Sequence, residues 1–280
     1  MVENGIFTLD DDIDRKTISS ITIPNSVTKI GKKAFEDCGS LEEVIIPDSV
    51  TRIGENAFYN CKSLKSIIIP NSVMQINALA FFGCESLTKV VLPDSIEWIE
   101  AGTFEYCTSL ESVTIPNSVE RIGFRAFACC TSLESVTIPD SVDTIERYAF
   151  AYCKSLKSVT IPDSILTIER GTFYRCFSIK EVIIPDSVTW IEHGAFEDCE
   201  SLEEISIPDS VNRIEEYAFI GCKSLKRAIF SSSVKVVMGT RDEEDGCRFI
   251  PIRNVTFSDT DIMMQVCVHA FDMRVVFTRR

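Results

Sequence analysis

The sequence is almost without histidine and has no closely spaced pair of metal-binding cysteines. His193 and His269 are its only histidines, and no Cys-x-x-Cys occurs among its 12 cysteines. Structural zinc sites need four converging ligands at short spacing, and a nucleophilic serine needs a base such as histidine to activate it. No acid, base, nucleophile or metal cluster therefore converges in the sequence. We expect no enzymatic activity, no metal site and no cofactor.

The sequence has fewer basic than acidic residues. Against 42 Asp and Glu the chain has 28 Lys and Arg, which gives a formal net charge of −14. Binding to phosphates requires clustered Lys and Arg, and glycine-rich phosphate loops are absent as well. The composition excludes nucleic acid as an expected partner. Net acidity favours solubility and, at most, basic partners.

Long apolar runs are also missing. No segment approaches the roughly 20 apolar residues that a membrane-spanning helix requires. The N-terminal stretch MVENGIFTLDDDIDRK has neither the basic nor the apolar region of a signal peptide. We expect no membrane insertion, and a cytoplasmic location by default.

The sequence does contain a strict internal repeat. Proline, phenylalanine and cysteine each recur nine times at steps of 23 residues, from Pro24 to Pro208, from Phe35 to Phe219 and from Cys38 to Cys222. Three residue types with one common period indicate a solenoid of stacked coils, since a single coil of this length cannot bury its own apolar face.

One repeat illustrates the expected local structure. Val44 and Ile46 alternate with polar residues, as in a short strand with one buried face. Pro47 has no N–H to donate and ends the strand, and Asp48 and Ser49 provide turn chemistry. When coils stack, equivalent residues lie above one another. The period predicts a strand ladder, a phenylalanine spine in which Phe127 packs between its two neighbours, and a column of thiols.

The pattern I-P-x-S-V-x-x-I-G-x-x-A-F-x-x-C-x-S-L, present almost intact from Ile46 to Leu64, resembles the BspA-like class of leucine-rich repeats. This resemblance implies an α/β-type repeat solenoid. It would be a right-handed horseshoe with a parallel β-sheet on its concave face and short irregular or 3-10 segments on its convex side. It also implies a binding or adhesion surface, and a surface or secreted location as an alternative to the cytoplasm. The glycine of the I-G-x-x-A-F part of this pattern is present as Gly31, Gly54 and Gly123, but six other coils have a different residue at its position. We therefore expect an ordinary φ at this position.

The repeat also defines the domain organisation. Residues 1–17 are polar and acidic and are interpreted as an N-terminal cap. Residues 18–230 form the solenoid, and residues 231–280, where the period decays, are interpreted as degenerate repeats that form a C-terminal cap. The three parts make one continuous domain.

The columns of repeated polar residues each allow a chemical and a structural interpretation. Cysteines in neighbouring coils would have Cα atoms one strand spacing apart, about 4.8 Å, which is within the range for a disulfide. Their Cβ vectors would run parallel instead of facing each other, so we expect buried and reduced cysteines. Cys129 is the expected exposed thiol. Asp and Asn after each proline suggest either turn chemistry or a calcium ladder. The recurrent serines are expected to bond backbone groups rather than to act as nucleophiles.

Residues that vary between coils are the candidates for partner binding, because the scaffold does not dictate them. At one outward strand position, Ile45, Ile68 and Val91 follow one another, and Glu43 and Lys89 flank them at the other. An exposed apolar patch on a soluble protein indicates a partner, although β-branched residues also favour strands for their own sake.

Two tryptophans, Trp98 and Trp190, occupy equivalent polar positions four coils apart and are further candidates. The leading hypothesis is a non-enzymatic interaction or adhesion module that binds a protein or other macromolecule through the concave sheet and its rims. The alternative is an intracellular scaffold or regulatory subunit that positions another protein. We expect a monomer, with weak self-association as the alternative.

Overall fold

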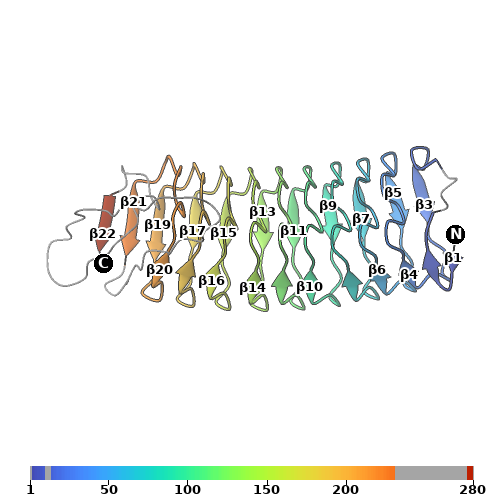
Figure 1. The fold of residues 1–280 in the computed structure, drawn as a ribbon, viewed down its shortest axis with the longest axis horizontal. Helices are drawn as coiled ribbons and strands as arrows, with labels where there is room; N and C mark the ends of the chain where they lie inside the picture. Colours follow the sequence, from blue (N-terminus) through green and yellow to red (C-terminus); the bar gives the residue numbers. More distant parts are fainter. Residues whose placement is uncertain (1, 10–13, 231–275, 280) are drawn as a thin grey trace, which may run out of the picture.

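The computed structural model of the chain describes residues 2–9, 14–230 and 276–279, and these form a row of stacked coils (Figure 1). Each 23-residue coil contributes one strand of three or four residues and one strand of two residues. From β2 (Ile6–Phe7) to β21 (Arg227–Phe230), paired strands of the same kind are parallel with an offset of 23 residues, for example Ser20 with Glu43 and Lys29 with Arg52. The period of the sequence repeat is therefore also the offset between paired strands.

The longer strands form the first row, which extends along the whole stack (Figure 1). In most of these strands exposed, buried and exposed side chains alternate, so one face of the row points into the core. They are β3 (Ser20–Thr22), β5 (Glu43–Ile45), β7 (Ser66–Ile68), β9 (Lys89–Val91), β11 (Ser112–Thr114), β13 (Ser135–Thr137), β15 (Ser158–Thr160), β17 (Glu181–Ile183), β19 (Glu204–Ile207), β21 (Arg227–Phe230) and β22 (Val276–Arg279).

The two-residue strands form a second row, which the sequence analysis did not predict. It follows the proline turn of each coil and buries one isoleucine per coil, such as Ile53. Its members are β4 (Lys29–Ile30), β6 (Arg52–Ile53), β8 (Gln75–Ile76), β10 (Trp98–Ile99), β12 (Arg121–Ile122), β14 (Thr144–Ile145), β16 (Thr167–Ile168), β18 (Trp190–Ile191) and β20 (Arg213–Ile214). At the N-terminal end, β2 (Ile6–Phe7) pairs in parallel with β4, and β1 (Val2–Glu3) pairs antiparallel with β2.

The described residues contain no helix of any kind, α or 3-10. The parallel sheet implied by the family resemblance is therefore present, but the α/β label and the 3-10 segments have no counterpart in this part of the chain. Turns and the second row take their place. The horseshoe curvature and its right-handed sense stay predictions.

The proline turn that the sequence predicted is present, and it connects the two rows. In coil after coil the residue three positions after proline donates its N–H to the proline carbonyl, as Val50 does to Pro47 at 3.0 Å. The serine two positions after proline donates its hydroxyl to a carbonyl of the preceding coil. Ser72, for example, donates to the carbonyl of Val50 at 2.7 Å. The predicted structural role is thus seen for this serine column at Ser72, Ser95, Ser141, Ser164 and Ser187.

The far side of each coil contains two further turns, closed by bonds such as Ala34 N–H to Gly31 O and Cys38 N–H to Phe35 O. The third residue of each turn has positive φ, as at Lys33 (58°) and Asp37 (59°), which is the feature of a type II turn. Gly31, Gly54 and Gly123 are not among the residues with positive φ, so the expectation of ordinary φ at that position is confirmed.

Glutamate replaces that repeat glycine for a visible reason. Glu146 accepts the backbone N–H of Phe124 at 2.8 Å, and Glu192 accepts that of Arg170 at 3.0 Å. Each carboxylate thus satisfies a donor at the start of the turn in the preceding coil. A hydrogen bond to a charged acceptor is stronger than one between neutral groups, so the replacement adds a link between coils.

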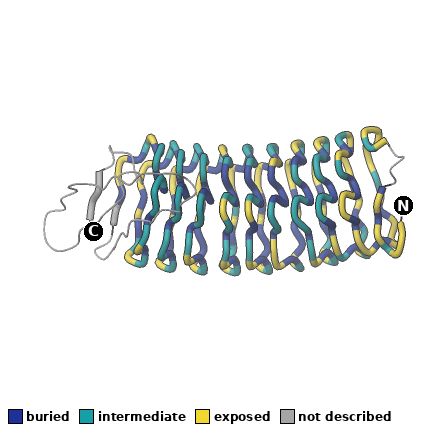
Figure 2. Tube along the Cα trace, viewed as in Figure 1, coloured by how far each residue is buried: buried dark blue, intermediate teal, exposed yellow. Residues whose placement is uncertain are grey.

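The core is one continuous column inside the coils, and Figure 2 shows buried segments in every coil along the stack. Phenylalanine rings from successive coils stack with centroids 5.0–5.7 Å apart, and Phe127 lies 5.4 Å from both Phe104 and Phe150. The rings are nearly parallel, at 11° and 3° for these two pairs. The predicted spine is confirmed.

The first coil has carbonyl groups with no preceding coil to donate to them, and Arg15 supplies donors. Its guanidinium donates to the carbonyls of Lys33, Ala34 and Glu36 at 3.1–3.3 Å. Phe7 continues the aromatic spine, with its ring 5.2 Å from that of Phe35. Residues 2–9 and 14–17 thus cover the open end, and they bury Phe7 and Leu9.

At the other end, β22 pairs in parallel with β21 and extends the first row. The rest of the predicted C-terminal cap, residues 231–275 and 280, lies outside the described residues.

Phe127→Ala should lower the free energy of unfolding by about 3–5 kcal/mol, because it removes a fully buried ring and leaves a cavity between two others. Coils contact only their neighbours, so we expect denaturation to separate into two transitions. Urea unfolding followed by circular dichroism measures both effects. Phe124→Ala is the control, since this exposed ring belongs to the same coil; a loss of less than about 1 kcal/mol is expected there. Equal losses for the two variants would contradict the spine.

Arg15→Ala should destabilise the first coils by about 1–2 kcal/mol, because three backbone acceptors lose a charged donor. Native-state hydrogen exchange measures this locally: amides of residues 29–41 should exchange faster, while those of residues 150–200 should keep their rates. Lys16→Ala, which alters the adjacent exposed residue, is the matched control. A uniform increase along the chain, or none, would show that Arg15 does not close this end.

Candidate interaction surface

Five of the seven candidate residues lie together on the outward face of the first row. Ile45 ends β5, Ile68 ends β7 and Val91 ends β9, and Ile68 is the direct partner of Val91 in the parallel register. Their exposed fractions are 52%, 72% and 45%. We call these three side chains the aliphatic patch. Strand neighbours in a sheet are about 4.8 Å apart, so the three present one continuous apolar surface.

Charged residues flank this patch at the other outward position of the same strands. Glu43 begins β5 and Lys89 begins β9, and Ser66 lies between them on β7. All three are exposed. The surface therefore combines an apolar centre with an acid at one end and a base at the other, which orients a bound partner rather than holding it.

The residue just before each first-row strand often forms an ion pair with the equivalent residue of an adjacent coil. Lys65 and Glu42 lie 2.6 Å apart, as do Lys157 and Glu134, again with a separation of 23 residues. More than half of each of these four side chains is exposed, and such pairs contribute only about 0–1 kcal/mol. They leave the aliphatic patch itself uncharged.

The two tryptophans belong to the second row, on β10 and β18, and not to the aliphatic patch. Trp98 is exposed and Trp190 is half-buried. Each is covered by the arginine of the next coil: the Arg121 guanidinium lies 5.1 Å from the Trp98 ring and that of Arg213 lies 4.3 Å from Trp190. These contacts are cation–π interactions. The structure therefore separates the predicted site residues into one group of five and two isolated tryptophans.

Two exposed apolar residues outside the strands escaped the sequence analysis. Met74 and Leu166 are each 63% exposed and occupy the position just before the second-row strand. Equivalent positions in other coils hold Thr51, Glu97 and Asp143. An apolar exception in a polar column was the signal that could have identified them.

The thiol column is buried among the described residues, as predicted, and its reduced state stays a prediction. Ten cysteines are free, and nine of them are buried while Cys129 is partly exposed. Each thiol of the column from Cys61 to Cys222 donates to the carbonyl of the preceding coil's phenylalanine, as Cys61 does to Phe35 at 3.2 Å. This role was missed in the sequence analysis. Burial raises the pKa of the Cys61 and Cys84 thiols, which keeps them protonated and able to donate.

No group of three or more His, Cys, Asp or Glu side chains in residues 2–9, 14–230 and 276–279 could hold a metal ion. No helix there is long and apolar enough to cross a membrane. The aspartates and asparagines after each proline are part of the turns described above.

The fold and this surface define a repeat solenoid with parallel strands, whose fixed core displays variable outward residues. Residues 14–134 and 120–240 match the family described as "BspA type Leucine rich repeat region", in 6 copies. The chain belongs to this family of leucine-rich repeat proteins. A comparison with curated proteins gave no match.

Several solved structures of bacterial proteins are similar to this chain. A leucine-rich repeat protein of T. pallidum is 30% identical, with 66% of this chain and 78% of that chain covered and a TM-score of 0.50. The pneumococcal vaccine antigen PcpA is 22% identical over 87% of this chain and 74% of that chain, with a TM-score of 0.54. A leucine-rich cell surface protein of Faecalibacterium prausnitzii is 30% identical over 76% and 79%, with a TM-score of 0.44.

Among the described cysteines, Cys129 should react first with a thiol reagent such as iodoacetamide. Burial is the main reason that the pKa of Cys129 is raised, and its hydrogen bond with Tyr106 partly offsets that rise; the other nine are enclosed. Reactivity requires the thiolate, so labelling should accelerate as the pH rises. Peptide mapping by mass spectrometry under native conditions measures each site. The Cys129→Ser variant is the control, and equally rapid labelling of Cys61 or Cys84 would contradict a closed thiol column.

Proposed function

We propose that this protein is a non-enzymatic interaction and adhesion module that binds a macromolecular partner through the outward face of the first row. The observation that carries the proposal is the aliphatic patch, three exposed apolar side chains on consecutive strands of a soluble, acidic chain. Leaving such a surface in water costs about 25 cal/mol per Å² of apolar area. A partner that covers it recovers that free energy.

The repeat fold supports the same function. Core positions hold the same or similar residue types in nearly every coil, whereas outward strand positions differ more between coils. A rigid scaffold with a variable surface suits partner recognition, as in other repeat proteins. Protein binding is also the general use of leucine-rich repeats, and the family membership makes it the expected activity here.

The physical character of the surface indicates the kind of partner. An apolar centre with Glu43 at one end and Lys89 at the other fits a protein surface that offers apolar side chains between a basic and an acidic group. The apolar contacts would supply most of the affinity, and the charges would set orientation and association rate. Localisation of the full-length protein in its cell distinguishes an adhesion module from an intracellular scaffold.

Ile68→Asp should weaken partner binding by at least about 2 kcal/mol, since it places a charge at the centre of the aliphatic patch. The partner is first captured by a photo-crosslinking amino acid at position 68 and identified by mass spectrometry. Binding of the wild type and the variant is then compared by surface plasmon resonance. Lys89→Gln should mainly change the association rate and its dependence on salt.

The matched control is Thr137→Asp, because Thr137 occupies the same exposed strand position two coils beyond Val91. Crosslinking from position 137 should capture nothing in common with position 68. If Ile68→Asp keeps its native circular dichroism spectrum and binds as well as the wild type, the aliphatic patch is not the binding surface.

A further inference from the structure

The second row contains a motif that recurs after four coils. Trp98 on β10 and Trp190 on β18 are the only tryptophans of the chain, and both occupy the first position of their strand. An arginine occupies the same position of the next coil in both cases, and it covers the ring, Arg121 at 5.1 Å and Arg213 at 4.3 Å. The other members of this column are polar: Lys29, Arg52, Gln75, Thr144 and Thr167.

The exposed apolar residues Met74 and Leu166 recur with the same spacing. Each belongs to the coil before a tryptophan and lies one position earlier in that coil. The carbonyl of Leu166 accepts the N–H of Thr189, the residue that precedes Trp190, at 2.8 Å. An apolar and an aromatic residue therefore occur together twice on the outer surface of the second row.

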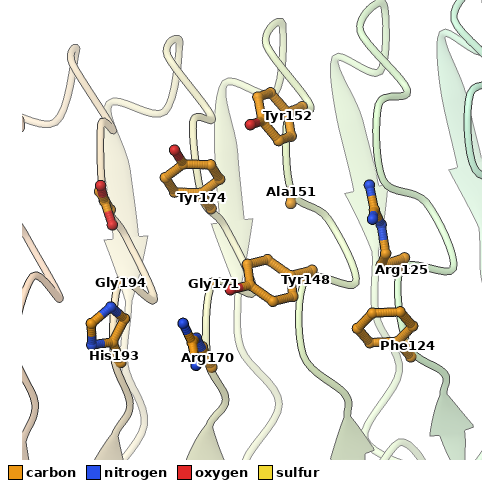
Figure 3. A pocket seen from close by; sticks show the side chains of 11 residues that line it. Phe124, Arg125, Tyr148, Ala151, Tyr152, Arg170, Gly171, Tyr174, His193 and Gly194 are labelled. Atoms are coloured by element: carbon orange, nitrogen blue, oxygen red, sulfur yellow. The ribbon is translucent and has the colours of Figure 1, made fainter. Parts of the chain in front are cut away.

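Aromatic residues on the turn side of the solenoid are arranged differently. Around the depression shown in Figure 3, rings of neighbouring coils pack on one another, Phe124 with Tyr148 at 6.3 Å and Tyr152 with Tyr174 at 5.2 Å, both edge to face. Their surfaces are used in contacts within the chain. The tryptophans are instead single rings in a polar column, and Trp98 remains exposed beside its arginine.

The spacing of the tryptophans matches a polyproline II helix. Neighbouring strands lie about 4.8 Å apart, so Trp98 and Trp190 are separated by about 19 Å, with Thr144 halfway between them. A polyproline II helix advances about 3.1 Å per residue with three residues per turn, so every third residue returns to the same edge after about 9.3 Å. Two coils span nearly the same length, about 9.6 Å.

Positions i, i+3 and i+6 of such a helix therefore align with Trp98, Thr144 and Trp190. An extended strand would return to the same face after every second residue, about 6.6 Å, which is not a multiple of the coil spacing. The register of the solenoid thus favours a polyproline II ligand over a strand.

The charge of this surface is negative. Glu97, Glu120 and Asp143 precede the second-row strand in three consecutive coils, and all three are exposed. Within the described part of the chain, none of them belongs to an ion pair. The arginines over the tryptophans are each paired with a carboxylate, at 3.5 Å for Arg121 and 2.8 Å for Arg213. On the other side of the strands, glutamate replaces the repeat glycine in most of these coils. Such a surface attracts basic ligands.

We propose that the second row from Trp98 to Trp190 binds a basic, proline-rich segment of another protein in the polyproline II conformation. Prolines at i and i+6 pack on the two tryptophans, and lysine or arginine between them faces the column of free carboxylates. Aromatic side chains are the usual docking sites for such segments, which lose little conformational entropy because they are already extended. This surface is separate from the aliphatic patch, so the inference does not rest on the proposed function.

The arginines prepare the site for this ligand. Their cation–π contacts hold each indole in one orientation before binding. Trp98 is exposed, whereas Trp190 is half-buried under the closer arginine. Trp98 therefore offers more surface to a ligand, and its removal should cost more affinity than the removal of Trp190.

The experiment uses the full chain and the acetylated, amidated peptide Pro-Lys-Ala-Pro-Lys-Ala-Pro. Because the chain has no other tryptophan, its intrinsic fluorescence reports on this surface alone, and isothermal titration calorimetry measures the affinity. We expect a saturable fluorescence change and a dissociation constant below about 1 mM. Trp98→Thr should weaken binding about 10-fold, and Trp190→Thr by a smaller factor. Threonine already occupies this position in two coils, so the variants should keep the native circular dichroism spectrum.

The charge and the spacing are tested separately. Glu120→Gln should weaken binding at low salt and reduce its dependence on ionic strength. A double variant, Trp190→Thr with Thr167→Trp, keeps two tryptophans but places them three coils apart. It should bind no better than Trp190→Thr alone. Arg52→Thr changes the same column outside the site and is the matched control, for which we expect wild-type affinity.

Several results would overturn the proposal. These are the lack of saturable binding by the folded wild type, wild-type affinity in Trp98→Thr, and wild-type affinity in the double variant. A peptide with alanine in place of each proline should bind at least about 10-fold more weakly. Equal binding of that peptide, or tighter binding of the neutral sugar maltohexaose, would show that the ligand class is wrong.

Discussion

The 23-residue register between neighbouring coils is the constraint on which the rest of the structure depends. Every parallel strand pair from β2 to β20 joins residues 23 positions apart, and the turns bond to the next coil with offsets close to that value, as Phe35 N–H does to Ala57 O at 2.7 Å. A buried backbone group without a partner is costly. An inserted or deleted residue inside a coil would misalign the bonds of that coil with its neighbours, which explains the invariant spacing of proline, phenylalanine and cysteine.

The core columns show how one register serves packing and hydrogen bonding together. Each phenylalanine carbonyl accepts the N–H of the cysteine three residues later and, from the next coil, a thiol S–H, as Phe35 O does from Cys38 and Cys61. Cysteine is small enough for the corner and provides a weak donor. Alanine would fill the space without the donor, and serine would bring a more strongly hydrated hydroxyl into an apolar site. This dual fit explains why a protein without described disulfides keeps so many thiols.

Outside the core, the same register turns single residues into surfaces. A residue type that persists for two or three coils becomes a patch, as with the isoleucines and valine of the first row. Carboxylates also accumulate in this way. Burial raises the pKa of both Glu169 and Glu192, and the negative charge of Glu192 adds to the effect on Glu169. Backbone N–H donors and arginines of adjacent coils offset part of that cost.

The sequence by itself determined the solenoid, the strand of each coil, the proline turn, the phenylalanine spine and the buried thiols, because each depends on a residue type recurring at a fixed spacing. It also located Glu43, Ile45, Ile68, Lys89 and Val91 on one face, since strand alternation and the period together fix their direction. Only the tertiary structure revealed the second row, the positive φ of Lys33 and its equivalents, and the cation–π contact of Arg121 with Trp98. Two-residue strands are too short for a periodic signal, and the residues with positive φ are glycine, asparagine or aspartate in only some coils. The direction of a long side chain depends on its neighbour one coil away.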